Sequence, residues 1–225
     1  MNTPMKLPAM LSKCAIFDFD STLISIETLD FLIGKSAKEN KSEVEKITHM
    51  AMSGKLTFAD SLRLRFADIK LEKSDIDALK NEICNYLTEG FVTGINQLES
   101  EFDIYIISGG FLEIIAPVAE KLGISPKNCF ANNFIYQDQK VVGFEQANIM
   151  AQNGGKPKIV EQILSKKSYD KIFMIGDGYT DLEVSKANSK VTFCGFGEHV
   201  VRDSVLKEAE NFFYNVADLI KFLRQ

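Results

Sequence analysis

Short apolar runs with strand character alternate with helical stretches along most of the chain. The strand-like runs end at Phe17, Ile107, Ile175, Cys194 and Tyr214, and helices are predicted at 111–122, 154–168 and 217–223. Apolar strands that alternate with helices are typical of a parallel sheet with helices on both faces. We therefore expect an α/β protein whose core is a doubly wound, Rossmann-like parallel sheet.

The region after the first strand has a different pattern, because it is helical and contains no good strand. Helices are predicted near 25–32, 42–53, 57–70 and 72–87, the last two with Thr57 and Ser74 as N-caps. An insertion of this size is typical of a helical cap, although the same helices could simply pack on the sheet. We assign 28–90 to the cap, 13–27 and 91–225 to the α/β core, and 1–12 to an N-terminal tail.

A hairpin is predicted inside the core. Two apolar stretches, 134–136 and 141–142, flank the polar residues 137–140, which is the pattern of two antiparallel strands joined by a turn. We expect residues 131–146 to form this β-hairpin as a small flap.

Polar residues follow three of the predicted strands where those strands end. Asp18, Ser108 and Asp177 each come after the last apolar residue of a strand, beside small residues or glycine. The carboxyl ends of parallel strands gather at one edge of the sheet, where ligands bind in this class of fold. Asp18 and Asp20 also point to one face if the extended backbone continues. A bare Asp-x-Asp is as often an ordinary solvated strand end, but three such coincidences indicate a site.

The residue types at this edge suit phosphoryl transfer. Carboxylates of Asp18 and Asp177, with a backbone carbonyl near Asp20, are the hard oxygen ligands that Mg²⁺ prefers. Ser108 and the amides of the two glycines after it can surround an anion, because glycine lets N–H groups approach closely. Lys156 begins a helix after two glycines and adds positive charge where a helix N-terminus already favours anions. Together these groups neutralise phosphoryl oxygens, which is most of what such catalysis needs.

Composition and charge narrow the classes of partner. The 225 residues are 45% hydrophobic and carry a net charge of −5 without a basic run, so neither nucleic acid nor an anionic membrane is expected to bind. The four cysteines are widely spaced and form no Cys-x-x-Cys pair, which predicts reduced thiols in a cytoplasmic protein. No segment has the length and apolar character of a signal peptide or a membrane span.

The motifs resemble those of the haloacid dehalogenase superfamily, taken in order along the chain. They are Asp18-Phe19-Asp20-Ser21-Thr22, Ser108-Gly109-Gly110, Lys156, and Gly176-Asp177-Gly178-Tyr179-Thr180-Asp181. From Ala15 onward the chain more closely resembles the phosphoserine phosphatases within that superfamily. This likeness lies in Ile24-Ser25-Ile26-Glu27, Ala51-Met52-Ser53-Gly54 with Phe58 and Arg65, Ile106-Ile107-Ser108-Gly109-Gly110-Phe111, Phe130-Ala131-Asn132 and Gly154-Gly155-Lys156.

The resemblance implies a catalytic role for each matching core residue. Asp18 would be the nucleophile that takes the phosphoryl group as an aspartyl phosphate, and Asp20 would protonate the leaving alkoxide and then activate water. Ser108 and Lys156 would hold the phosphoryl oxygens. Mg²⁺ would be bound by Asp18, Asp20 and Asp177, with Asp181 in the layer behind them.

The resemblance also implies how a substrate would be recognised. Glu27 would face an ammonium group and Arg65 would bind a carboxylate, for which its planar fork is suited. The alternative for these two residues is a solvated charge on a helix face. The remaining implied contacts come from Met52 and Gly54, which would shape the pocket, and from Gly109, Gly110, Asn132 and Thr180.

The implied activity is Mg²⁺-dependent hydrolysis of O-phospho-L-serine to L-serine and phosphate, the last step of serine biosynthesis. The alternative is a phosphatase or phosphotransferase of the same superfamily for another small phosphomonoester, because residues 146–152 and Thr93 depart from the phosphoserine phosphatase pattern. A non-catalytic phospholigand-binding protein is disfavoured, since binding alone needs neither a nucleophile nor an acid. The chain is expected to be a monomer or a homodimer.

Overall fold

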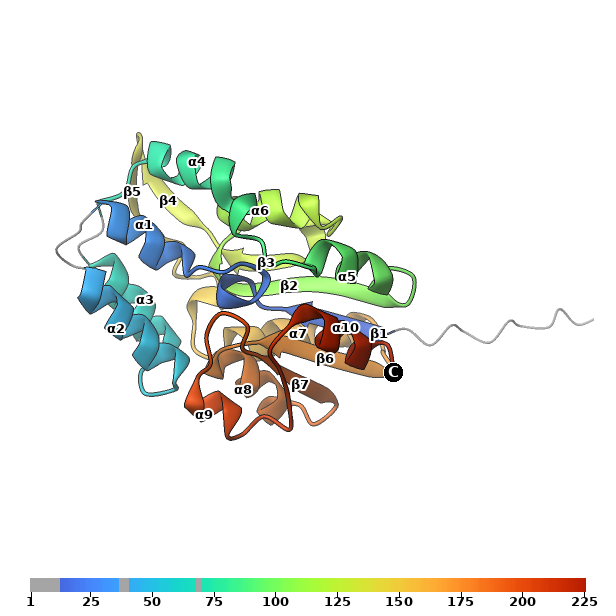
Figure 1. Ribbon diagram of the computed structural model, residues 1–225. Helices are drawn as coiled ribbons and strands as arrows, with labels where there is room; N and C mark the ends of the chain where they lie inside the picture. The colour runs from blue at the N-terminus through green and yellow to red at the C-terminus, as the bar shows by residue number, and fades with distance from the viewer. Residues whose placement is uncertain (1–12, 37–40, 68–69) are drawn as a thin grey trace, which may run out of the picture.

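Six parallel strands form the main sheet of the protein (Figure 1), in the order β3-β2-β1-β6-β7-β8. The computed structural model describes residues 13–36, 41–67 and 70–225, so the predicted tail at 1–12 lies outside the described residues. The strands are β1 (Lys13–Phe17), β2 (Phe102–Phe111), β3 (Cys129–Asn132), β6 (Lys171–Gly176), β7 (Val191–Phe196) and β8 (Asn211–Phe213). The predicted α/β class with a doubly wound parallel sheet is confirmed.

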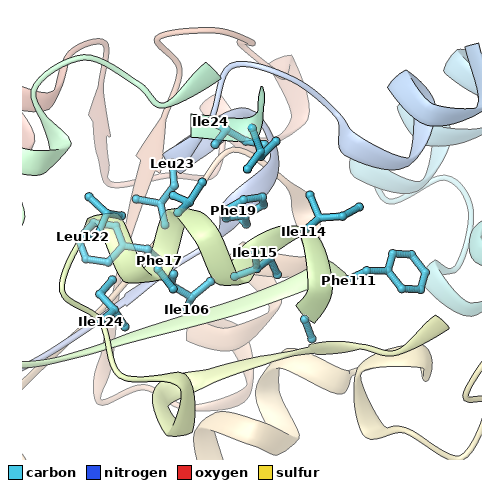
Figure 2. Close-up of a cluster of buried hydrophobic side chains, with 14 of the residues drawn as sticks. Phe17, Phe19, Leu23, Ile24, Ile106, Phe111, Ile114, Ile115, Leu122 and Ile124 are labelled. Atoms are coloured by element: carbon cyan, nitrogen blue, oxygen red, sulfur yellow. The ribbon is translucent and has the colours of Figure 1, made fainter. Parts of the chain in front are cut away.

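Helices cover both faces of this sheet. On one face lie α5 (Phe91–Leu98), α6 (Leu112–Lys121) and α10 (Val216–Leu223), and on the other α7 (Gly155–Lys166) and α8 (Tyr179–Ala187), with the short α9 (Asp203–Leu206) nearby. Alternation along β1 explains the two layers, because Phe17 packs in one apolar cluster (Figure 2) and Ile16 in the other. Within the described ranges, no helix combines the length and apolar character that crossing a bilayer requires.

The strand order places a crevice at the carboxyl ends of β1 and β6. After β1 the chain adds β2 and β3 on one side, and then returns to place β6, β7 and β8 on the other. Ligands of open parallel sheets bind at such a reversal. Phe17 pairs with Ile175, and the Asp18 N–H donates to the Ile175 carbonyl at 2.8 Å. The first residues after β1 and β6 are therefore neighbours.

An inserted set of helices lies beside this edge (Figure 1), as the predicted cap requires. It contains α1 (Thr28–Ser36), α2 (Lys41–Met52), α3 (Phe58–Phe66) and α4 (Lys73–Glu82), followed by a 3₁₀ turn at Ile83–Tyr86. Thr57 caps α3 as predicted. Ser74 does not cap α4, because the helix begins earlier and the Asp75 side chain accepts from the Glu72 N–H at 2.8 Å. The exact limits of the cap, 28 and 90, stay a prediction.

The predicted β-hairpin is present as a separate two-stranded antiparallel sheet. It consists of β4 (Phe134–Gln137) and β5 (Lys140–Phe144). Phe134 stacks on Phe111 at the end of β2, and Phe144 packs on Phe66 of α3 with ring centroids 4.9 Å apart. The hairpin therefore contacts both the core sheet and the inserted helices. The limits proposed for the flap, 131–146, stay a prediction.

Candidate active site

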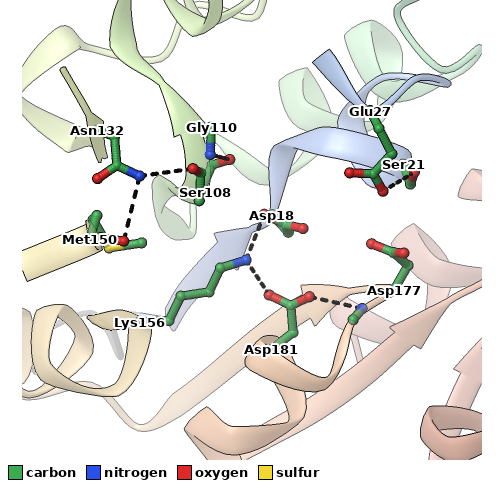
Figure 3. Close-up of polar contacts among 12 residues, drawn as sticks. Asp18, Ser21, Glu27, Ser108, Gly110, Asn132, Met150, Lys156, Asp177 and Asp181 are labelled. Carbon is green, nitrogen blue, oxygen red and sulfur yellow. Dashed lines mark hydrogen bonds and ion pairs between the residues drawn. The ribbon is translucent and has the colours of Figure 1, made fainter. Parts of the chain in front are cut away.

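Lys156 bridges two buried carboxylates at the centre of the sheet edge (Figure 3). Its Nζ lies 2.6 Å from Asp18 Oδ1 and 2.6 Å from Asp181 Oδ1. Gly154, with φ +66°, makes the turn into α7 that brings this side chain inward. Burial opposes the ammonium charge, but Asp18 and Asp181 together raise the pKa of Lys156. Lys156 is therefore a fixed positive charge beside Asp18.

Three carboxylates could hold a cation. Oxygens of Asp18, Asp177 and Asp181 lie within 4.8 Å of one another. Asp181 is occupied on both sides, since it accepts from Lys156 and, at 3.0 Å, from the Gly178 N–H. Asp18 and Asp177 are thus the more available pair, and hard oxygens in this arrangement fit Mg²⁺.

Ser108 and the glycines after it lie in a bulge of β2, and not beyond its end. The predicted strand stops at Ile107, whereas β2 continues to Phe111. The pairing of β2 with β3 shifts its register between Ile107 and Phe111. A bulge re-aims side chains, and here the fully buried Ser108 Oγ accepts from the Gly110 N–H at 2.9 Å. Asn132 holds this bulge from behind, because its Nδ2 donates to the Gly109 carbonyl at 2.8 Å.

Asp20 lies in the turn that follows Asp18. Its Oδ1 accepts from the Thr28 N–H, at the start of α1, at 2.8 Å. Its Oδ2 lies against Gly110, since a Cβ added to Gly110 would be 2.9 Å from this oxygen. Burial raises the pKa of Asp20 to about 7, with Asp18 adding to the effect and the Thr28 N–H opposing it. A carboxylic acid with this pKa can both give and take a proton near neutral pH.

Glu27 is held by a residue for which the sequence analysis gave no role. Glu27 Oε1 accepts from Ser21 Oγ at 2.8 Å and from Arg202 Nη2 at 3.0 Å. The buried Arg202 also donates from Nε to Asp177 Oδ2 at 2.7 Å. The only sequence signal for Arg202 is a basic residue in the loop after β7, at the same edge of the sheet.

Arg65 approaches the site from α3. It is buried, and its Nη1 lies 3.3 Å from Asp30 Oδ1 and 3.3 Å from Thr48 Oγ1. Among the residues that the structure describes, the Arg65 Nε has no hydrogen-bond partner. A buried guanidinium N–H without a partner is costly, so Arg65 has donor capacity left for a ligand.

Most of the predicted site residues line a single cavity. Its lining contains Asp18, Asp20, Glu27, Met52, Arg65, Ser108, Gly109, Gly110, Lys156, Asp177 and Thr180, together with Leu29 and Phe58. Gly54, Asn132 and Asp181 lie outside it. Asn132 donates to the Gly109 carbonyl and Asp181 accepts from Lys156, so both contact residues of the lining. Gly54 packs against the Tyr179 ring, because a Cβ added to Gly54 would be 3.0 Å from that ring.

The raised carboxyl pKa values predict a pH-dependent stability for the metal-free protein. Burial raises the pKa of Asp20 to about 7 and that of Glu27 to about 8, so the folded protein holds protons that the unfolded chain has lost above about pH 4. Because the folded state binds more protons, the free energy of unfolding falls as pH rises. We expect a decrease of about 1–3 kcal/mol between pH 5 and 8, allowing for solvent screening.

Urea unfolding with a chelator at each pH unit measures this decrease. The double variant Asp20→Asn, Glu27→Gln should make the profile less steep, because neither replacement titrates, although burial still raises the pKa of Asp181. A wild-type profile that is flat or rises over this range would contradict the prediction.

Comparison with known proteins assigns the family. The pattern of haloacid dehalogenase-like hydrolases matches residues 15–186. The phosphoserine phosphatase of Mus musculus is 35% identical over 211 residues, which cover 93% of this chain and 92% of that protein. The phosphoserine phosphatase of Methanocaldococcus jannaschii is 33% identical over 219 residues, which cover 94% of this chain and 96% of that protein.

Solved structures give the same result. A phosphoserine phosphohydrolase-like protein from Francisella tularensis superposes with a TM-score of 0.86 at 31% identity, over 93% of this chain and 99% of that one. A substrate-bound phosphoserine phosphatase superposes with a TM-score of 0.80 at 28% identity, over 94% and 98%. The chain therefore belongs to the haloacid dehalogenase-like hydrolases and, within them, to the phosphoserine phosphatase family of phosphoric monoester hydrolases.

Proposed function

We propose that this protein is a Mg²⁺-dependent phosphatase that hydrolyses O-phospho-L-serine to L-serine and phosphate, the last step of serine biosynthesis. The observation that carries the proposal is a single cavity that holds two kinds of group. Asp18, Asp20 and Lys156 supply phosphoryl-transfer chemistry, and Glu27 and Arg65 supply a carboxyl group and a guanidinium, one for each end of an amino acid.

The reaction follows from the carboxyl groups after β1. An Asp18 carboxylate oxygen forms a bond to phosphorus as the bond from phosphorus to the serine oxygen breaks, and Asp20 gives its proton to that leaving oxygen. The ionised Asp20 then takes a proton from water, which attacks the aspartyl phosphate and releases phosphate. The pKa of Asp20, raised to about 7 by burial, suits both steps.

Charge on the phosphoryl oxygens is neutralised by fixed groups. Lys156, Ser108, Gly109 and Gly110 line the cavity together with Asp18, so they would surround the phosphoryl group. Mg²⁺ would be held by Asp18 and Asp177, with the backbone carbonyl of Asp20, and it would supply further positive charge beside the phosphoryl group.

Recognition of serine is assigned to Glu27, directly before α1, and to Arg65 of α3. Glu27 would pair with the substrate ammonium and Arg65 would bind its carboxylate. Asp30 and Thr48 orient the Arg65 guanidinium from one side, at 3.3 Å each. Met52 and Thr180 would complete the pocket, and Gly54 and Asn132 would support its wall from outside.

A cytoplasmic location is also proposed. All four cysteines are free thiols, and burial raises the pKa of Cys14 and Cys194 to about 12, so both are poorly reactive. Whether the chain is a monomer or a homodimer stays a prediction.

Phosphate release from a panel of small phosphomonoesters tests the function. We expect L-phosphoserine to be hydrolysed in preference to phosphoethanolamine, phosphothreonine and a sugar phosphate, and a chelator to stop the reaction. Preference for another ester would replace the substrate assignment, and turnover in the presence of chelator would overturn the metal assignment.

A contact between core and cap predicts a further effect on activity. Asn153 Oδ1 accepts from the Ala59 N–H of α3 at 3.0 Å, across 94 residues of sequence, and Phe58 beside it packs on Gly109. Loss of this hydrogen bond should weaken the contact between the core and α3 by about 1 kcal/mol. We therefore expect Asn153→Ala to lower kcat/KM for phosphoserine by about three- to tenfold.

Steady-state kinetics measure this effect against a matched control. Asn133→Ala removes an exposed asparagine that donates to Glu145, the residue after β5, and takes no part in the Ala59 contact. Equal kinetic constants for Asn153→Ala and Asn133→Ala would show that the Asn153 contact does not contribute.

A further inference from the structure

Arg202 is a buried charged residue that the proposed reaction leaves without a role. It lies between β7 and α9, and only 7% of it is exposed. Its Nε donates to Asp177 at 2.7 Å and its Nη2 to Glu27 at 3.0 Å. One guanidinium thus joins the carboxylate proposed for Mg²⁺ to the carboxylate proposed for the substrate ammonium.

Arg202 contacts these carboxylates from outside the cavity. Asp177 and Glu27 both line the cavity, whereas Arg202 is not part of the lining. The guanidinium bonds Oδ2 of Asp177 and Oε1 of Glu27, which leaves the second oxygen of each carboxylate for a ligand. Arg202 therefore does not occupy the place where Mg²⁺ or a substrate ammonium would bind.

The loop that carries Arg202 is anchored to the connection between core and cap. His199 Nε2 lies 2.8 Å from Thr88 Oγ1, and the Thr88 hydroxyl also lies 2.8 Å from the Thr22 carbonyl. A hydroxyl has one proton, which goes to the carbonyl, so the His199 Nε2–H is the donor to Thr88. His199 therefore ties the Arg202 loop to Thr88, next to the segment that leads from Asp18 to Glu27.

We propose that Arg202 is a positioning residue that holds Asp177 and Glu27 in binding geometry, so that Mg²⁺ affinity and ammonium recognition depend on the same guanidinium. The buried carboxylate of Asp177 and the partly buried carboxylate of Glu27 repel each other, and the planar fork of arginine satisfies both at once. Without Arg202 nothing would hold these two carboxylates in place, so they would turn apart and each would lose its ligand. This inference rests on the proposed function.

Calorimetric titration of the protein with Mg²⁺, without substrate, tests the metal part. Arg202→Gln should weaken Mg²⁺ binding by about tenfold or more, because Asp177 loses its charge-assisted donor. Arg224→Gln is the control, since it removes the same charge from an exposed arginine that contacts Gln97. Unchanged or tighter binding in Arg202→Gln, with Arg224→Gln equal to wild type, would overturn the proposal.

Nuclear magnetic resonance of the wild-type protein tests the geometry, and the variant Arg202→Lys is needed only to assign one signal. The chain has four arginines, Arg63, Arg65, Arg202 and Arg224, so their Nε–H signals are few. The signal that Arg202→Lys removes should exchange slowly with water and stay protected when Mg²⁺ is added. Its loss on adding Mg²⁺ would show that Arg202 is a counter-ion displaced by the metal, which contradicts positioning.

Selectivity for the substrate amine tests the Glu27 part. The ratio of kcat/KM for phosphoserine to that for the same ester without its amino group should fall about tenfold in Arg202→Gln, and Arg202→Lys should restore part of it. An unchanged ratio would overturn this part. If phosphoserine is not the substrate, the Mg²⁺ titration still tests Arg202, so the two failures are distinguishable.

Discussion

Asp18→Asn is expected to abolish turnover of phosphoserine, by at least about 10³-fold, because an amide is too weak a nucleophile to accept the phosphoryl group. The fold should survive this change. Lys156 keeps its 2.6 Å contact with Asp181, and one of several buried carboxylates is lost from a crowded acidic site. Single-turnover phosphate release measures the chemical step, and thermal unfolding measures the stability.

The control for this variant is Asp170→Asn, which makes the same chemical change at an exposed position. It should leave both kinetics and stability unchanged. Wild-type-like turnover in Asp18→Asn would exclude the aspartyl phosphate. Lost turnover together with a lost unfolding transition would show that Asp18 is needed for folding, and the nucleophile would then have to be identified by trapping the phosphorylated residue.

The sequence predicts Asp18 and Asp177 well because each ends an apolar run. All residues of β1 from Cys14 to Phe17 are fully buried, so a carboxylate directly after them is conspicuous. The same reasoning gives the wrong end for β2. Gly109 and Gly110 resemble a strand break, whereas the structure uses them in a bulge that is closed by Asn132.

Helix α5 was not among the predicted elements, for a physical reason. Its β-branched residues and Gly94 are poor helix formers. The helix is stabilised by packing, because Gly94 lies so close to Ile220 of α10 that an added Cβ would come within 2.7 Å. A contact between residues 126 positions apart has no local signal in the sequence.

Arg202 illustrates the same limit within the site. Its partners Asp177 and Glu27 are 25 and 175 residues away, and nothing in the surrounding loop marks the side chain as buried. Glu27 and Arg65 were found only through the resemblance to a family. Residue types and strand ends predict where chemistry occurs, but the contacts that hold those residues require the folded chain.

Arg65→Ala is expected to separate recognition from chemistry. The contact proposed for Arg65 is to the substrate carboxylate, and a charge-assisted pair of hydrogen bonds is worth about 100-fold or more in kcat/KM. An aromatic phosphate without a carboxylate never made this contact, so its hydrolysis should fall by less than about threefold. The ratio of the two activities, measured on one enzyme preparation, is independent of how much of the variant is folded.

Arg63→Ala is the matched control, since Arg63 lies two residues away on α3 and is exposed, with Asp60 as its partner at 3.1 Å. It should change neither activity. Arg65→Lys keeps the charge but loses the planar fork, so phosphoserine hydrolysis should be intermediate. Equal losses on both substrates in Arg65→Ala would instead place Arg65 in the catalytic step or in cap closure. The substrate assignment would then depend on Glu27 alone, and a carboxylate that binds an ammonium group does not distinguish serine from other amines.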